Sequence, residues 1–501
     1  MASDSPQTSP SRPKLHGRAF YESIGSPNFI LAPMVDQSEF AWRLLTRFFL
    51  PAERQPSLLA YTPMFHARLF ASGPKYRDAA FQPFQRSWTS LNGPAETAEP
   101  LYLDGNPAHD RPLFVQFCAN DPTELLSAAQ YVAPYCDAID LNLGCPQGIA
   151  RKGHYGAFLQ EDWDLIYRLI NTLHTNLSIP VTAKMRILDT REQTLAYACM
   201  ILSAGASIIT VHGRRREQKG HNTGVADWEM IKYLRDNLPA DTVLFANGNI
   251  LQHSDIQACL AATGADGVMS AEGNLHDPSI FAEPPTPGSN NREYWWGADG
   301  RGGYRVDAVL RRYLDIIYTH VLGTTPPVRQ PLFIIGDKAF DNGKAKETST
   351  SGEEEKKQSK ASTQSNNPNL TAMKAHVFAL MRSLIPTHTH IRDTIARARG
   401  GDMDAFEQVL ALTEAAIRDE FINQSKIENS FTSLEINDSV ENSSIRARCV
   451  RPWWVVQPYI RPLPEEAIAK GSMQMSKKAK KELAEREMAA NPQAEPIAAA
   501  A

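Results

Sequence analysis

The chain has 501 residues, 42% of them hydrophobic and 22% charged, a composition typical of a globular protein with a large core and two or three domains. Its net charge of −4 argues against nucleic-acid binding through overall charge, so any RNA contact has to come from local basic patches. We find no apolar run long enough to span a bilayer, no secretory signal in residues 1–14 and no CxxC pair among the six cysteines, which argues against a membrane protein, a secreted protein and a zinc site.

Short apolar runs alternate with helical patterns after a Ser/Pro-rich N-terminal tail, residues 1–19, which we expect to be disordered. The eight runs are Phe29–Met34, Leu58–Met64, Leu113–Phe117, Ala138–Leu143, Val181–Met185, Ile208–His212, Val243–Gly248 and Asp266–Ser270. Continuous apolar character is what a strand buried on both faces requires, and stretches such as Trp163–Leu173 and Asp227–Leu238 have helical spacing. Eight βα units predict an α/β fold, a (β/α)₈ TIM barrel over residues 20–290. A doubly wound open sheet is the alternative, but it needs fewer strands, and the sequence has no early G-x-G-x-x-G turn.

A helical pattern follows the barrel, and we assign residues 300–425 to a small C-terminal α-helical domain. Residues 339–369 within it have almost no large apolar side chains, so we expect a disordered insert there. The Gly- and Pro-rich stretch Thr89–Asp110 is expected to be a surface insertion. Residues 437–501 are expected to form a mostly disordered tail with a basic segment, Lys477–Lys481.

The residues that close each predicted strand are candidates for a site, because functional groups of a TIM barrel lie at the carboxyl ends of its strands. The first strand closes on Pro33, Met34 and Val35, which suit one face of a flat aromatic ring and equally suit an ordinary apolar strand end. Gln116 closes the third with an amide able to hydrogen-bond a ring, although alone it is weak evidence. The fourth leads to Cys145, between a glycine and a proline at the mouth of the barrel. A buried structural thiol is the other interpretation, and the position favours function.

The later strands add cationic and amide groups at the same rim. Lys184 and Arg186 are two residues apart and therefore share a face of the fifth strand, where a lysine needs an anionic ligand or a salt bridge to a neighbouring strand. His212 closes the sixth strand. The seventh and eighth close on the segments Asn247-Gly248-Asn249 and Ala271-Glu272. Loops after these two strands form the usual phosphate site of such barrels, since glycines let backbone N–H groups approach a phosphate closely.

Six motifs occur together in this order: Leu31-Ala32-Pro33-Met34-Val35, Asn142-Leu143-Gly144-Cys145-Pro146-Gln147, Ala183-Lys184-Met185-Arg186, Val211-His212-Gly213-Arg214, Ala246-Asn247-Gly248-Asn249 and Ala271-Glu272-Gly273-Asn274-Leu275. In this order and spacing they resemble the tRNA dihydrouridine synthases, over the stretch from Phe20 to Pro284. The last motif and the segment Pro452–Pro462 are similar to the eukaryotic branch that acts at tRNA positions 16 and 17.

The resemblance implies an FMN-dependent enzyme that uses NAD(P)H to reduce the uracil 5,6 double bond in tRNA. It implies that Pro33, Met34 and Val35 line the flavin, that Gln116, Lys184 and His212 bind it, that Asn247, Gly248, Asn249, Ala271 and Glu272 surround its phosphate, that Cys145 is the catalytic acid, and that Asn142 and Arg186 hold the uracil. Most of the wider family has Gly-Arg in place of Ala271-Glu272, which here removes one cation and leaves a backbone contact. The chemistry agrees, because no side chain supplies a hydride and a cysteine thiol is still largely protonated at neutral pH.

The partner expected for this enzyme is tRNA, bound by a basic set in the helical domain, Arg382, Arg392, Arg397 and Arg399. A solvated helix face is the alternative interpretation of that set. Two other functions stay open: a flavin reductase of a free pyrimidine, and a non-catalytic RNA-binding protein on a decayed barrel. We expect no metal site and no membrane contact, a monomer, and a location in the cytoplasm, the nucleus or both.

Overall fold

The computed structural model describes residues 14–85, 87–88, 102–286, 292–297, 302–335, 337, 367–428 and 451–461. The chain divides into two compact units, the first formed by residues 1–216 and 226–459 and the second by residues 217–225 and 460–501. All helices and strands named below belong to the first unit. Within the second, Arg461 donates a hydrogen bond to the backbone oxygen of Gly220. In the described ranges, no helix is both long enough and apolar enough to cross a membrane.

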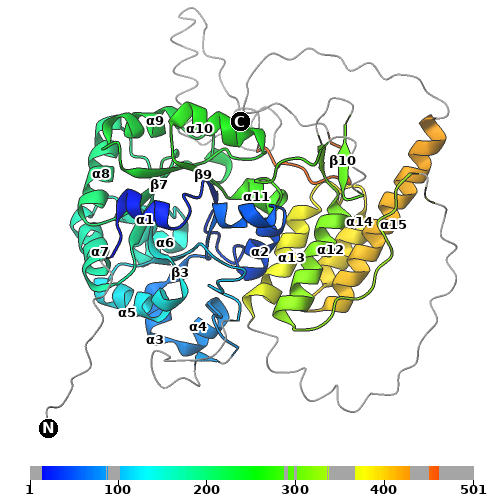
Figure 1. Ribbon diagram of the computed structural model, residues 1–501, viewed down its shortest axis with the longest axis horizontal. Coiled ribbons are helices and arrows are strands. Elements are labelled where there is room, and N and C mark those ends of the chain that lie inside the picture. The colour runs from blue at the N-terminus through cyan, green and yellow to red at the C-terminus, as the bar shows by residue number, and fades with distance from the viewer. Residues whose placement is uncertain are drawn as a thin grey trace, which may run out of the picture. The chain divides into compact units, whose positions relative to one another are not determined.

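Eight parallel strands close into a barrel, which confirms the predicted TIM-barrel fold (Figure 1). They are β1 (Phe29–Leu31), β2 (Leu58–Tyr61), β4 (Leu113–Cys118), β5 (Ala138–Leu143), β6 (Val181–Arg186), β7 (Ile208–His212), β8 (Val243–Asn247) and β9 (Gly267–Ser270). Each strand pairs with the next in this order, and β9 pairs with β1, so the ring of strands is complete. Nearly all residues of these strands are buried, as continuous apolar runs require.

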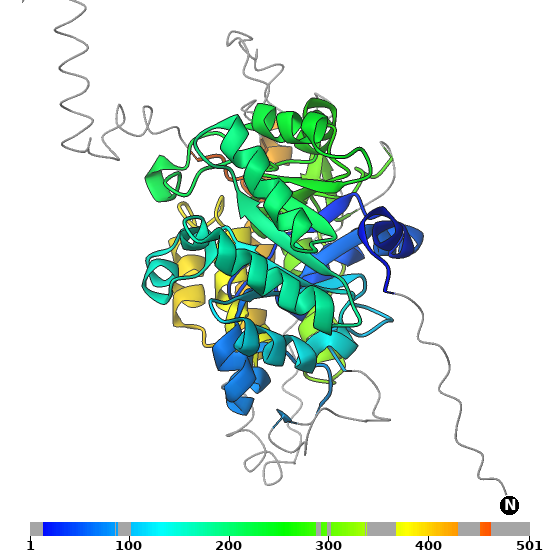
Figure 2. The ribbon, with the colours of Figure 1, turned by 90° about the vertical axis from the view of Figure 1, so that its left-hand side faces the viewer.

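Helices between the strands cover the outside of the barrel, and Figure 2 shows several of them, in teal and green, in front of the strands. They are α3 (Ala67–Ser72), α4 (Pro74–Ala80), α5 (Pro122–Val132), α7 (Trp163–Asn176), α8 (Arg191–Ser203), α9 (Trp228–Asn237) and α10 (Ser254–Thr263). Four of them begin after a short polar residue whose side chain accepts a hydrogen bond from a backbone N–H of the first turn, namely Asp121, Asp162, Thr190 and Asp227. Such caps satisfy donors that the helix itself leaves unpaired and fix where each helix begins.

The barrel interior has its own cluster of buried side chains, distinct from the core between strands and helices. It is formed by Ile30, Leu59, Tyr61, Phe114, Ala138, Ile208, Val243, Phe245 and Met269. Helix α1 (Gly17–Ser23) packs Phe20 and Tyr21 on this cluster. Residues 14–19, which we expected in a disordered tail, are held by this packing, and Lys14 donates to backbone oxygens of the α7 end. Two aromatic residues just beyond the polar tail therefore anchor it.

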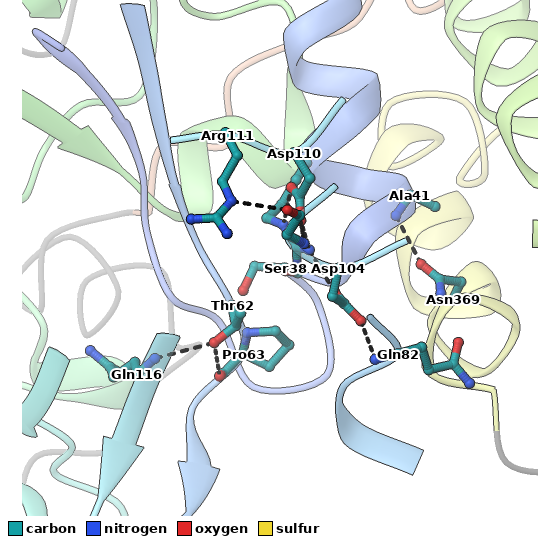
Figure 3. A network of polar contacts seen from close by, with 12 residues as sticks. Ser38, Ala41, Thr62, Pro63, Gln82, Asp104, Asp110, Arg111, Gln116 and Asn369 are labelled. Carbon is teal, nitrogen blue, oxygen red and sulfur yellow. Dashed lines mark hydrogen bonds and ion pairs between the residues drawn. The ribbon is translucent and has the colours of Figure 1, made fainter. Parts of the chain in front are cut away.

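The second predicted strand, Leu58–Met64, is interrupted in the structure. β2 ends before Thr62, and a two-residue strand, β3 (Phe65–His66), continues the pairing with β4. Pro63 lies at the break, where it has no N–H to donate to a neighbouring strand. Figure 3 shows the hydroxyl of Thr62 donating to the Pro63 oxygen and accepting from the backbone nitrogen of Gln116. The apolar pattern alone predicted a single strand, because hydrophobicity does not show that Pro63 lacks a backbone N–H.

A second group of helices follows the barrel and shares its core. They are α12 (Val306–Ile316), continued by a π-helical turn (Ile317–Val321), α13 (Pro368–Leu380), α14 (Thr389–Arg397) and α15 (Met403–Glu428), preceded by a hairpin of β10 (Tyr294–Trp296) and β11 (Gly302–Tyr304). Helices α12 and α13 pack against α2 (Phe40–Phe48), which follows β1, and α13 also packs against α11 (Glu272–His276), which follows β9. One continuous hydrophobic core therefore joins these helices to the outer layer of the barrel.

Helix α13 begins inside the stretch that we expected to be disordered, residues 339–369. Asn367 caps it, and Asn369 is completely buried. The side-chain oxygen of Asn369 accepts a hydrogen bond from the backbone nitrogen of Ala41 on α2, at 2.8 Å (Figure 3). Local composition could not indicate this contact, because the partner is 328 residues away in sequence. Residues 338–366 lie outside the described residues.

A segment of the expected C-terminal tail, residues 451–459, packs on the helical region. Trp454 and Val455 are buried against α15, and Val455 forms a β-bridge with Arg305 just before α12. The apolar side chains that interrupt the polar tail supply this packing. The rest of that tail, residues 437–450 and 462–501 with Lys477–Lys481, lies outside the described residues.

Residues 102–110 belong to the expected surface insertion, and two of their aspartates form ion pairs with the buried Arg43 of α2. The Arg43 guanidinium lies 2.6 Å from carboxylate oxygens of both Asp104 and Asp110, and all three side chains are buried. Figure 3 shows the other oxygen of Asp104 accepting from the backbone of Gln82. Two carboxylates tolerate burial here because one guanidinium pairs with both. Residues 89–101 lie outside the described residues.

Candidate active site

The strand registers bring five predicted site residues to neighbouring positions. Asn142 on β5 is opposite Lys184 on β6, Arg186 on β6 is opposite His212 on β7, and His212 is opposite Asn247 on β8. All five lie at or near the carboxyl ends of their strands, the end at which parallel barrels carry their sites. Four adjacent strands therefore supply cationic, amide and imidazole groups to one rim.

Cys145 lies on the turn that follows β5, and its side chain is partly exposed. Its backbone nitrogen donates to Oδ1 of Asn142 at 2.8 Å, and its backbone oxygen accepts from the nitrogen of Ala157 at 3.1 Å. Gly156 has a φ of +65°, and a Cβ there would lie 2.8 Å from the Cys145 oxygen. Only glycine fits that contact without strain, so the turn holds the cysteine backbone while leaving the thiol partly accessible.

Gln116, the predicted ring-binding amide, is buried and has protein partners at both ends of its side chain. Nε2 donates to Asp140 Oδ2 at 2.8 Å, and Oε1 accepts from Asn142 Nδ2 at 2.8 Å. One N–H and one lone pair of this amide are left for a ligand. Asp140 also accepts from Thr182 at 2.6 Å. Burial raises the pKa of Asp140 to about 6, with the two hydrogen bonds opposing that rise.

Lys184 supplies an ammonium group to this rim from β6, opposite Asn142 of β5. Its Nζ donates to Oδ1 of Asn247 at 2.9 Å. Burial lowers the pKa of Lys184 to about 8, with a smaller contribution to that shift from the neighbouring guanidinium of Arg186. No carboxylate within 4 Å of Nζ is found among the described residues. An ammonium held only by a neutral amide is suited to an anionic ligand.

Arg186 on β6 and His212 on β7 lie opposite each other at the rim. Arg186 Nε donates to the Gly144 oxygen at 2.7 Å, which ties β6 to the turn that carries Cys145. The ring of His212 is 3.0 Å from Arg214 Nη1. Burial holds the pKa of His212 well below its ordinary value, and the surrounding cations add to this effect. His212 is therefore a neutral imidazole at physiological pH.

The segment after β8 has the features of an anion site. Gly248 has a φ of +115°, and a Cβ there would lie 2.6 Å from Ala226 and 3.1 Å from the His212 ring. Asn249 also has left-handed backbone, with a φ of +62°. Its Oδ1 accepts from Arg214, whereas its buried Nδ2 has no hydrogen-bond partner among the residues that the structure describes. A buried amide donor without a partner costs free energy unless a ligand accepts from it.

The remaining predicted residues lie after β1 and β9. Pro33 and Met34 are half-buried, and Val35 is 55% exposed. The backbone nitrogen of Met34 donates a hydrogen bond to the hydroxyl of Ser38. Ala271 packs on the interior cluster, and Glu272 is half-buried at the start of α11. β9 pairs with β1, so these two loops are adjacent.

Two residues of this arrangement were not singled out from the sequence: Asp140, which anchors Gln116, and Gly156, which makes room for the Cys145 turn. Asp140 carries a readable signal, since a carboxylate in an apolar strand, two residues before Asn142, must share its face. Gly156 carries no such signal in the sequence, because its close contact with the Cys145 oxygen arises only when the turn has folded back.

Comparison with known proteins gives consistent matches. The family model described as "Dihydrouridine synthase (Dus)" matches residues 30–298. The chain is 45% identical over 452 residues to a tRNA-dihydrouridine(16/17) synthase [NAD(P)(+)] of Saccharomyces cerevisiae, covering 90% of this chain and 87% of the relative. It is 44% identical over 463 residues to the Schizosaccharomyces pombe protein of the same name, covering 91% and 94%. A Mus musculus protein, tRNA-dihydrouridine(16/17) synthase [NAD(P)(+)]-like, is 36% identical over 478 residues, covering 94% and 76%.

Proposed function

Because the chain belongs to the dihydrouridine synthase family, we propose that it is a tRNA-dihydrouridine synthase that reduces uridines 16 and 17 of tRNA with NAD(P)H. The observation that carries the proposal is similarity over nine-tenths of the chain to relatives of that name. The partly exposed thiol of Cys145, on a rim shared with Lys184 and His212, supports it.

We propose FMN as the bound cofactor, and the residues of the rim fit such a group. The partnerless Nδ2 of Asn249, together with Gly248, suits a phosphate. Lys184 suits the electron-rich edge of the ring, because within the described ranges its Nζ is bound by the neutral amide of Asn247 and by no carboxylate at hydrogen-bond distance. Ala271 and Glu272 would contribute through the backbone. When bound, the flavin supplies hydride transfer, which no side chain can provide.

Cys145 is proposed as the acid of the reaction. Reducing a 5,6 double bond adds a hydride at C6 and a proton at C5, and the Sγ–H of Cys145 gives that proton. The thiolate left behind takes a proton from solvent before the next turnover. The backbone nitrogen of Cys145 is bound to Asn142, and its backbone oxygen is bound to the nitrogen of Ala157. These two hydrogen bonds keep the thiol at the rim during this exchange. Asn142 and Arg186 hold the turn and, in this proposal, border the uracil.

RNA binding is proposed for the helical region. Arg382, Arg397 and Arg399 are exposed on or beside α13 and α14. Arg392 is exposed as well and pairs with Asp393 at 3.0 Å. Exposed cations on one region of an acidic protein are suited to phosphate contacts. The target base must also leave its stack to reach the barrel rim, which is the usual requirement for chemistry on a base.

The test is a direct assay of the purified protein. We expect a yellow protein with one FMN per chain, which forms dihydrouridine in unmodified tRNA when NAD(P)H is added, as measured by mass spectrometry of digested tRNA. Free uridine should not react appreciably. A folded protein that takes up no added FMN contradicts the cofactor. Equal reduction of free uridine and tRNA would favour a free-pyrimidine reductase.

A further inference from the structure

Asp140 is a buried carboxyl group for which the proposed reaction has no direct use. Its side chain is completely buried on β5, and no ion pair is made by it among the residues that the structure describes. Oδ1 accepts from the hydroxyl of Thr182 and Oδ2 from Nε2 of Gln116. A buried carboxyl group is costly when no cation pairs with it directly, so a structural or functional reason for keeping Asp140 in the barrel interior is expected.

The hydrogen bonds that start at Asp140 run in one direction to the turn of Cys145. An ionised carboxyl group only accepts, so Gln116 must face it with Nε2. The Oε1 of Gln116 then faces Asn142, which donates from Nδ2 at 2.8 Å. Asn142 must consequently point Oδ1 at the turn, where it accepts from Gly144 N at 3.1 Å and Cys145 N at 2.8 Å. Each amide has one donating and one accepting end, so fixing the first orients the second.

From this chain of contacts we infer that Asp140 is a positioning residue, which orients the Asn142 amide and thereby holds the Cys145 turn for proton donation to the substrate. The inference rests on the proposed function. Asp140 does not contact the thiol, and it acts through Gln116 and Asn142. Arg186, which donates to the Gly144 oxygen, holds the opposite side of the same turn.

The decisive variant is Asp140→Asn, which keeps the shape but can present either an oxygen or an NH₂ to Gln116. The two half-reactions are measured separately in FMN-loaded protein, namely flavin reduction by NADPH without tRNA and flavin reoxidation by tRNA. We expect reduction within about twofold of wild type and reoxidation slower by about tenfold, the scale of replacing a charge-assisted hydrogen bond. Thr182→Val is the matched control, because it removes the other hydrogen bond to Asp140 and leaves the amide chain intact. Its reoxidation should stay within about twofold.

Flavin reoxidation at the wild-type rate in Asp140→Asn overturns the inference. Equal slowing of both half-reactions also overturns it, because a merely structural role would slow flavin reduction and flavin reoxidation alike. A second comparison applies if Asp140→Asn loads FMN poorly. The double variant Asp140→Asn/Gln116→Glu transfers the carboxylate from position 140 to position 116. The carboxylate at position 116 again requires Asn142 to donate from Nδ2. The flavin of the double variant should therefore be reoxidised by tRNA faster than that of Gln116→Glu alone. A double variant no faster than Gln116→Glu contradicts the inference. If wild-type protein forms no dihydrouridine at all, the proposed function fails instead.

Discussion

The polar groups of the candidate site are largely engaged with one another before any ligand arrives. Gln116 is held by Asp140 and Asn142, and Lys184 is held by Asn247. Side chains fixed in this way lose little further entropy when a ligand binds, which favours tight and oriented binding. Among the described residues the exceptions are the Nδ2 of Asn249 and the thiol of Cys145, and these are the groups that we assign to phosphate and substrate.

Cys145→Ala should separate the two halves of the reaction. The variant should retain FMN and its reduction by NAD(P)H, while uridine reduction should fall by about 10²- to 10⁴-fold, the usual contribution of a general acid. Rapid-mixing measurements of each half-reaction check this. Cys118→Ala is a matched control, since Cys118 belongs to the same small cluster but is buried, with its pKa raised to about 12 by desolvation. Dihydrouridine formation at the wild-type rate in Cys145→Ala would require another acid.

FMN affinity should weaken as pH rises through about 8. In the free protein the pKa of Lys184 is about 8, so the ammonium is present below that pH and lost above it. An anionic ligand binds the charged form better, and the dissociation constant should therefore rise above pH 8, by up to about tenfold per pH unit for one coupled proton. Fluorescence titrations at pH 7, 8 and 9 measure it. Lys184→Arg stays charged and should bind FMN with little pH dependence; the same slope in both proteins would exclude Lys184.

At the scale of elements, the turn between β5 and α6 (Gly148–Gly153) decides where the thiol lies. Three separate contacts fix this turn: Asn142 to its nitrogens, Arg186 to the Gly144 oxygen and the close approach of Gly156. The turn belongs to a barrel loop, yet its geometry depends on β6 as much as on β5. A rigid barrel that carries a well-braced loop is a common way to hold a reactive group.

Gly156→Ala should misplace the Cys145 turn. The added Cβ meets the Cys145 oxygen at 2.8 Å, and the φ of +65° is itself unfavourable for alanine. We expect a loss of more than about 1 kcal/mol of stability and a clear loss of uridine reduction, with FMN retained. Thermal unfolding and the two half-reactions measure these effects. Gly148→Ala is the matched control in the same loop, because a Cβ there has open space. Equal behaviour of the two variants would contradict this role of Gly156.

At the scale of the first compact unit, the barrel and the helical region are not independent. The ring of Trp42 on α2 stacks on His376 of α13 with centroids 3.8 Å apart, and His376 lies 3.1 Å from Glu39. The buried amide of Asn369 also binds α2. Deleting the helical region would expose this apolar face of the barrel and leave polar groups unpaired. Surface substitutions are therefore the better test of where tRNA binds.

Replacing Arg392, Arg397 and Arg399 with alanine should weaken tRNA binding and flatten its salt dependence. Each lost phosphate contact should reduce the slope of log K against log salt by about 0.7 to 0.9. Filter binding at several salt concentrations measures the slope, while FMN content and NAD(P)H oxidation should not change. A matched control replaces Arg168, Arg191 and Lys232, which are exposed on the outer barrel helices. Wild-type binding by the first variant, with loss on replacing Lys477–Lys481, would assign binding to the tail instead.

The sequence by itself determined the barrel strands apart from the break at Pro63, the helical stretches between them and the rim on which the predicted site residues lie. Burial on both faces leaves a continuous apolar run, and caps such as Asp121 and Asp162 mark helix starts, so both signals are local in the chain. The order of strands in a closed barrel then follows from the order in sequence, which brings Lys184 beside Asn142 and Arg186 beside His212.

The tertiary structure decided which polar groups pair and which do not. Asp140 with Gln116, Arg43 with Asp104, and Asn369 with Ala41 are separated by 24, 61 and 328 residues, and no periodicity encodes such pairs. The same holds for the Asn249 Nδ2, which has no partner in the described part of the chain, for the break at Pro63 and for the room that Gly156 leaves. A hydrogen bond depends on the positions of two atoms to within tenths of an ångström, and only the packed chain sets these positions.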